Sequence, residues 1–131
     1  MFDPRDERWG QTEKKEELLE RFAVVIPWPT MYETLRTRMV NNQGAMQRFE
    51  DYLKRPHLTL LDDTPYREDA LRLTLTCSLR PGRRPIHKAL SMVDCLIRLI
   101  LEDANVNVSY LATFNDRDFW DVCGKRRIEI F

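Results

Sequence analysis

Short apolar runs alternate along this chain with segments whose apolar residues recur at helical spacing. The runs lie at 23–26, 58–61, 108–113 and 128–131. A run such as 23–26, which is continuously apolar and ends at Pro27, is typical of a strand buried on both faces of a parallel sheet. The alternation therefore predicts an α/β sandwich with a mainly parallel sheet.

Helices are expected between these strands because capping and breaking residues frame the helical patterns. Thr30 is followed three residues later by Glu33, and Ser91 by Asp94, and both pairs match the capping box of a helix N-terminus. The other helices are expected to begin at Thr12, to span 45–54, to run from Thr64 to about Leu79, and to occupy part of 116–127; the helix that contains Asp94 is expected to span about 90–104.

Composition limits the class of protein. A chain of 131 residues fits one domain, 1–131. Lys+Arg and Asp+Glu both number 21, so net charge gives no general attraction to nucleic acid or membrane. No apolar run reaches the ~18 residues of a membrane span, and the charged N-terminus lacks the apolar region of a signal peptide. Three widely spaced cysteines indicate reduced thiols, so we expect a cytoplasmic protein without membrane contact.

Acidic residues recur where the chain leaves the predicted strands. Glu33 follows the 23–26 strand; Asn115, Asp116 and Asp118 follow the 108–113 strand. In parallel sheets, sites form at the carboxyl ends of the strands. Converging carboxylates repel one another and need a cation, and Mg²⁺ or Mn²⁺ prefers such oxygen ligands. With Asp94, these residues predict a hydrolytic metal site for a phosphodiester.

Each of these residues also has a purely structural interpretation. Glu33 and Asp94 fit capping boxes, in which the carboxylate accepts a hydrogen bond from the backbone of the N-cap residue. The acids at 116 and 118 suit a turn. Arg83 and Arg84, in the breaker-rich loop after position 80, suit either phosphate binding or a solvated surface loop. Spacing alone leaves these alternatives open.

Three segments together resemble the PIN domain, a family that includes the ribonuclease toxins of bacterial and archaeal toxin–antitoxin pairs. The segments are Val25-Ile26-Pro27 with Met31-x-Glu33-Thr34-Leu35, then Ser91-Met92-Val93-Asp94-Cys95-Leu96-Ile97, then Tyr110-Leu111-Ala112-Thr113-Phe114-Asn115-Asp116-Arg117-Asp118-Phe119. Their order and spacing match the family over roughly residues 12–131. The most specific piece is the last, a strand ending in Thr followed by Asn-x-x-Asp-Phe.

The resemblance implies a three-layer α/β/α sandwich and a Mg²⁺- or Mn²⁺-dependent endoribonuclease that acts as the toxin of a toxin–antitoxin pair. It implies catalytic and metal-binding roles for Glu33, Asp94 and Asp116, with Asn115 and Asp118 as further candidate ligands. Thr113 is expected to orient a ligand or water, and Arg83 and Arg84 to position the RNA backbone. A small antitoxin protein and a second copy of the chain are the partners that the family implies.

One part of the family pattern is missing. The family opens with a hydrophobic strand that ends in an acid, and no such strand precedes residue 20. Three explanations are open: the true start lies upstream of Met1, a separate chain donates the strand, or the domain has lost its catalytic role. The last case defines the rival hypothesis, a catalytically incomplete PIN-like domain that acts as a protein-interaction module.

Overall fold

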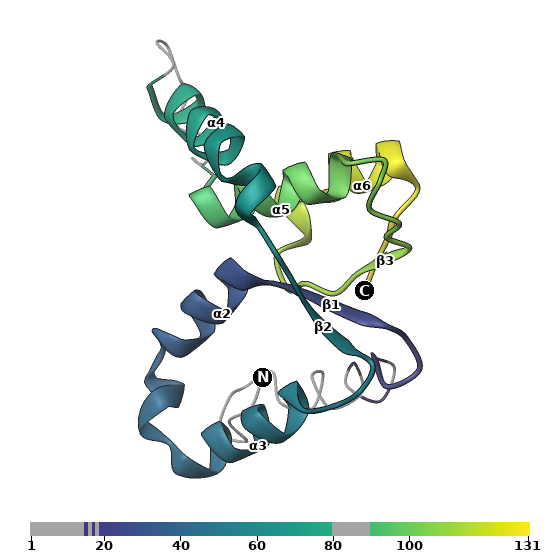
Figure 1. Ribbon diagram of the computed structural model, residues 1–131. Helices are drawn as coiled ribbons and strands as arrows, with labels where there is room; N and C mark the ends of the chain where they lie inside the picture. Colours follow the sequence, from purple (N-terminus) through teal and green to yellow (C-terminus); the bar gives the residue numbers. More distant parts are fainter. Residues whose placement is uncertain (1–14, 16, 18, 80–89) are drawn as a thin grey trace. The chain divides into compact units, whose positions relative to one another are not determined.

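The computed structural model describes residues 15, 17, 19–79 and 90–131. The chain divides into two compact units, Met1–Asp62 and Asp63–Phe131, which are described separately below (Figure 1). The helix expected from Thr12 falls largely outside the described residues. So do Arg83 and Arg84 in the basic loop.

The first unit is a strand–helix–helix–strand arrangement. Strand β1 (Val24–Pro27) leads directly into helix α2 (Trp28–Leu35), and a 3₁₀ turn at Arg38–Asn41 precedes helix α3 (Gln43–Leu53). Strand β2 (Leu58–Leu61) then pairs in parallel with β1, with Ile26 opposite Leu60. The predicted strand at 58–61 is confirmed at both ends, and the parallel pairing is confirmed with it.

The core of the first unit lies on one face of this two-stranded sheet. Side chains from α2, α3 and the two strands form the core. Its buried members are Met31, Ala45, Phe49 and Tyr52. Partly buried residues that pack against them include Ile26, Leu58 and Leu60. Val25 points away from this cluster and is 50% exposed. The expectation that the 23–26 strand is buried on both faces is therefore wrong, because alternate residues of a strand face opposite sides and the helices pack on one of them.

Helix α2 begins earlier than its sequence suggests. Its N-cap is Pro27, which makes no side-chain capping bond, and a proline occupies the first turn. Proline suits this position because the first-turn N–H groups have no partner inside the helix. Thr30 therefore lies inside the helix, and its carbonyl accepts a hydrogen bond from Thr34 Oγ1 at 2.8 Å. The predicted capping box of Thr30 with Glu33 is wrong.

The second unit is mainly helical. A 3₁₀ turn at Thr64–Tyr66 precedes α4 (Arg67–Leu79), and α5 (Met92–Glu102) packs against α4. Strand β3 (Tyr110–Leu111), a 3₁₀ turn at Asp116–Asp118, α6 (Trp120–Arg126) and strand β4 (Glu129–Ile130) complete the unit. The strand expected over 108–113 is thus reduced to two paired residues, which lie parallel to β4.

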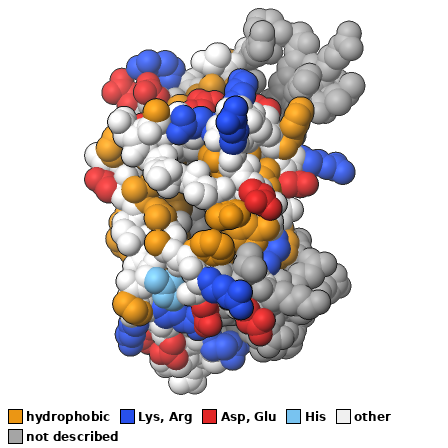
Figure 2. Space-filling model, turned by 90° about the vertical axis from the view of Figure 1, so that its right-hand side faces the viewer, with side chains coloured by type: hydrophobic (Ala, Val, Ile, Leu, Met, Phe, Trp, Pro, Cys, Tyr) orange, Lys and Arg blue, Asp and Glu red, His pale blue; other side chains and the backbone are white. Residues whose placement is uncertain are grey.

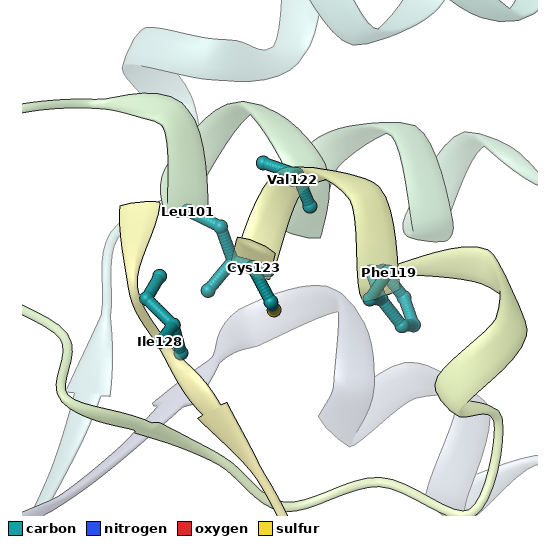
Figure 3. Packing of buried hydrophobic residues seen from close by; sticks show 5 residues of the cluster. All are labelled: Leu101, Phe119, Val122, Cys123 and Ile128. Atoms are coloured by element: carbon teal, nitrogen blue, oxygen red, sulfur yellow. The ribbon is translucent and has the colours of Figure 1, made fainter. Parts of the chain in front are cut away.

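A hydrophobic cluster joins α5, α6 and the two short strands (Figure 3). Its buried members are Leu101, Phe119, Val122, Cys123 and Ile128. Phe119, Val122 and Cys123 lie at the start of α6, and Ile128 is the residue before β4 (Figure 3). The cluster fixes the position of the 113–119 turn, because that turn is tied to it at Phe119.

The structure therefore confirms a mixed α/β chain with parallel strand pairs. Within the described residues, the strands form two separate pairs, β1–β2 and β3–β4. Among these residues, no helix is both long enough and apolar enough to cross a bilayer.

Candidate functional site

Four of the predicted site residues lie in one turn that leaves strand β3. The backbone N–H of Asn115 donates to Thr113 Oγ1 at 3.0 Å, so Thr113 shapes the turn. The Asn115 side-chain amide donates to Asp118 Oδ2, which brings these two candidate ligands together. Asp116 begins the 3₁₀ turn, and its carbonyl accepts from the N–H of Phe119 at 3.0 Å. Oxygen atoms from Asn115, Asp116 and Asp118 are thus gathered within one short segment.

Arg98 on α5 is hydrogen-bonded to the backbone of this turn. Its Nη1 donates to the backbone carbonyl of Asp118 at 2.6 Å. The same guanidinium forms a bidentate pair with Asp121, at 2.8 Å to Oδ1 and 2.6 Å to Oδ2. Hydrogen bonds from Arg98 hold the pKa of the Asp121 carboxyl at about 2, below its usual 3.8. Bidentate arginine pairs fix geometry as well as charge, so the site turn and α6 are fastened to one point of α5.

Arg98 was not among the site residues predicted from the sequence, although a signal was present. Arg98 is the one charged residue within the apolar stretch from Cys95 to Leu101. A charged side chain in such a stretch is seldom buried without a partner. Here its side chain is 17% exposed and pairs with a residue 23 positions further along.

Asp94 lies one helical turn before Arg98, at the start of α5. Its backbone N–H donates to Ser91 Oγ at 3.1 Å, and the Ser91 N–H donates to Asp94 Oδ2 at 3.2 Å. The Ser91 hydroxyl donates to the same oxygen at 2.7 Å. The predicted capping box of Ser91 with Asp94 is confirmed. The capping hydrogen bonds of the carboxylate are accepted by Oδ2, so the capping role leaves Oδ1 able to coordinate a cation.

Replacing Ser91 with alanine is expected to destabilise the N-terminal turn of α5 by about 1 kcal/mol, because a capping hydroxyl and its two partners lose their hydrogen bonds. Amide hydrogen exchange of the first turns of α5 would measure this. Thr37→Ala is a matched control, since Thr37 Oγ1 caps a 3₁₀ turn in the other unit by accepting from Met39. Equal exchange in wild type and Ser91→Ala would contradict the prediction.

Glu33 lies on α2, in the first unit, whereas the other predicted ligands belong to the second unit. Its side chain is exposed and forms no helix cap. The structural interpretation from the sequence thus holds for Asp94 and fails for Glu33. Among residues 15, 17, 19–79 and 90–131, no group of three His, Cys, Asp or Glu side chains is close enough to hold a metal ion.

Cys95 and Cys123 do not provide an activated thiol. Cys95 and Cys123 are buried in the second unit, and burial is the main cause that raises the pKa of each thiol. A raised pKa disfavours the thiolate, which is the nucleophilic form. These two side chains therefore serve packing, and the oxygen-rich turn after β3 remains the candidate functional site of the second unit.

Comparison with known proteins adds no relative: no family model, no curated protein and no solved structure matches this chain.

Proposed function

We propose that this chain is a PIN-like domain and acts as a Mg²⁺- or Mn²⁺-dependent endoribonuclease, the activity of toxins in toxin–antitoxin pairs. The observation that carries the proposal is the turn after β3, which contains Asn115, Asp116 and Asp118 and which Arg98 ties to α5, the helix whose first turn contains Asp94. Its donors are carboxylate and amide oxygens, which suit a hard divalent cation.

The residues have distinct roles in this proposal. The candidate cation ligands of this proposal are Asp94 and the carboxylates of Asp116 and Asp118, all in the second unit. Thr113 sets the turn that presents Asn115. A bound cation would activate water and stabilise charge on the phosphate during hydrolysis. Arg83 and Arg84, outside the described residues, remain candidates for contacts to the RNA backbone.

Cleavage of RNA with and without Mn²⁺ or Mg²⁺ tests the proposal. We expect metal-dependent cleavage by the wild type and a loss of at least about 100-fold, or about 2.7 kcal/mol of transition-state stabilisation, in Asp94→Asn. Asparagine keeps an oxygen that can accept the capping bonds and removes only the charge. Cleavage at the wild-type rate in Asp94→Asn would exclude this site.

Two variants separate loss of the charge from loss of the helix cap. Ser91→Ala removes the cap and keeps the Asp94 carboxylate, so it should retain cleavage. Glu68→Gln neutralises an acid that is 88% exposed on α4 and should also retain cleavage. A rise of the unfolding midpoint with Mn²⁺ in the wild type, absent in Asp94→Asn, would report cation binding without any reference to catalysis.

A catalytically incomplete PIN-like domain that binds another protein is the second candidate. The observation that favours it is the two-stranded parallel sheet of the first unit, because parallel sheets are normally covered on both faces and Val25 is half exposed. An antitoxin protein is one partner that the resemblance implies. A folded chain that shows neither metal-dependent cleavage nor a Mn²⁺-dependent change in its unfolding midpoint would support this candidate.

A further inference from the structure

Two free cysteines lie on helices that pack together inside the second unit. Cys77, on α4, is half-buried, and Cys95, on α5, is fully buried. Neither belongs to the proposed cation site. The surface gives a less specific signal, because side chains of both charges lie among hydrophobic ones on the face shown in Figure 2. The cysteine pair is therefore the feature from which a further activity can be inferred.

Cys77 lies on the side of α4 that is packed within the second unit. Ala70 is fully buried, and Leu73, Thr74 and Cys77 are half-buried. These positions recur at intervals of three and four residues, so they share one side of the helix. Leu75, on another side, is 49% exposed. Since α5 packs against α4, the side that contains Cys77 is the one that meets α5.

The order of contacts between the two helices brings Cys95 to the same place. The hydroxyl of Tyr66, just before α4, donates to Oδ2 of Asp103, just after α5, at 2.7 Å. Further along α4, the side chain of Thr74 is hydrogen-bonded with Cys95, which precedes Asp103 in the chain. The two helices therefore run in opposite directions. Cys77 is about one turn beyond Thr74, so it lies level with the start of α5, where Cys95 is found.

The electrostatics of Cys95 agree with this placement. Burial is the main cause that raises the pKa of its thiol; the hydrogen bond with Thr74 lowers that pKa, and the thiol of Cys77 raises it. One ionisable group shifts the pKa of another only when the two are near each other. Arg98 lowers the pKa of Cys95 and so favours the thiolate, the form that reacts with disulfides.

We propose that Cys77 and Cys95 form a redox-modification site, at which a low-molecular-weight disulfide such as oxidised glutathione converts them to a disulfide between α4 and α5. The thiolate of Cys77, the more accessible of the two, attacks one sulfur of the small disulfide, forms a mixed disulfide and releases a small thiol. The thiolate of Cys95 then attacks the sulfur of Cys77 and releases the second small thiol. The two cysteines lose two electrons and two protons, which the small disulfide takes up.

The new bond joins the helix that supports the candidate site. Cys95 follows Asp94 directly, and Arg98 on the same helix donates to the carbonyl of Asp118 in the turn after β3. Oxidation therefore fastens the start of α5 to α4, and a reducing thiol releases it. The second step is slow because burial disfavours the Cys95 thiolate. This inference does not depend on the proposed nuclease activity.

Oxidation of the folded full chain by oxidised glutathione, followed by alkylation of the remaining thiols, tests the site. Lys and Arg residues separate the three cysteines, so trypsin releases Cys77, Cys95 and Cys123 in different peptides and mass spectrometry identifies each linkage. The expected product is the link between Cys77 and Cys95 within one chain. Cys77 found only as a mixed disulfide with glutathione, or Cys95 linked instead to Cys123, would overturn the proposal.

The same reaction in urea shows whether the fold selects the pair. Loop closure in an unfolded chain depends only weakly on loop length, so all three cysteine pairs should form as a mixture. In the folded chain, the link between Cys77 and Cys95 should exceed the other two by at least about 10-fold, because disulfide geometry admits only thiols that lie close together. The same mixture in the folded chain as in urea would contradict the proposal.

Variants of the full chain supply matched controls. Cys123→Ser removes a buried thiol of the other hydrophobic cluster and should leave the link intact. Cys77→Ser combined with Leu75→Cys moves the thiol to an exposed side of α4, so it should give only a mixed disulfide with glutathione. A link from this displaced thiol to Cys95 would overturn the proposal, because the packed side of α4 would then not select the pair.

Urea unfolding shows whether the bond fits the folded unit. The oxidised wild type should have a higher urea midpoint than the reduced wild type, because a cross-link constrains the unfolded chain. Cys77→Ser should have the same midpoint before and after oxidation. A wild type whose midpoint does not rise on oxidation would overturn the proposal.

Discussion

Replacing Phe119 with alanine is expected to destabilise the second unit by about 3–5 kcal/mol, as truncation of a buried aromatic side chain does. Phe119 is 3% exposed and packs with Leu101, Val122, Cys123 and Ile128. These residues come from three separate elements, so the cavity could close only if several elements moved together. The loss should appear as a lower urea midpoint with an unchanged slope.

The neighbouring tryptophan supplies the control. Trp120 follows Phe119 directly but is 68% exposed, so Trp120→Ala should change the free energy of unfolding by less than about 1 kcal/mol. Equal losses in the two variants would mean that Phe119 is not a core residue. Because Phe119 also ends the turn with Asp116 and Asp118, the same variant should loosen the candidate site.

Replacing Arg98 with methionine is expected to destabilise the second unit by about 2 kcal/mol. The change removes two hydrogen bonds to Asp121 and one to the carbonyl of Asp118. The value lies between those for exposed and buried ion pairs because the Asp121 side chain is 40% exposed. Urea unfolding measures the loss. Arg72→Met, which breaks an ion pair on the exposed side of α4, should change the stability by less than about 0.5 kcal/mol.

The ion pair of Arg98 with Asp121 should also make the free energy of unfolding depend on pH in acid. A carboxyl whose pKa is lower in the folded protein stabilises that protein above its unfolded pKa, and the contribution is lost as pH falls through its folded pKa. For Asp121 this window lies between its usual 3.8 and about 2. Stability should therefore fall more steeply over this range in the wild type than in Asp121→Asn. Parallel acid profiles would show that Arg98 does not hold Asp121 in solution.

Two similar capping patterns had different outcomes, and the difference shows what sequence can predict. Ser91 and Asp94 form the predicted capping box, whereas Thr30 and Glu33 do not. The prolines at 27 and 29 explain the second case, because they move the helix start to Trp28 and leave Thr30 inside the helix. A capping pattern is thus reliable only when the residues before it allow the helix to begin there.

The candidate site stays a prediction. The residues of the turn after β3 were chosen from their position behind an apolar run, and in the structure Asn115 is hydrogen-bonded to both Thr113 and Asp118. The Arg98 contacts were not predicted, since they join residues 20 and 23 positions apart. Whether a charge inside an apolar helix finds a partner depends on which helix packs beside it.

Local chemistry was enough to predict the strand at 58–61, the helix that starts after Ser91 and the turn acids at 116 and 118. Their hydrogen bonds and side-chain periods involve residues a few positions apart, so local chemistry suffices. Only the tertiary structure decided that Val25 is exposed, that β3 is two residues long, and that Arg98 pairs with Asp121. These features depend on which surfaces meet when distant segments pack, and that choice is made by burial and pairing across the whole unit.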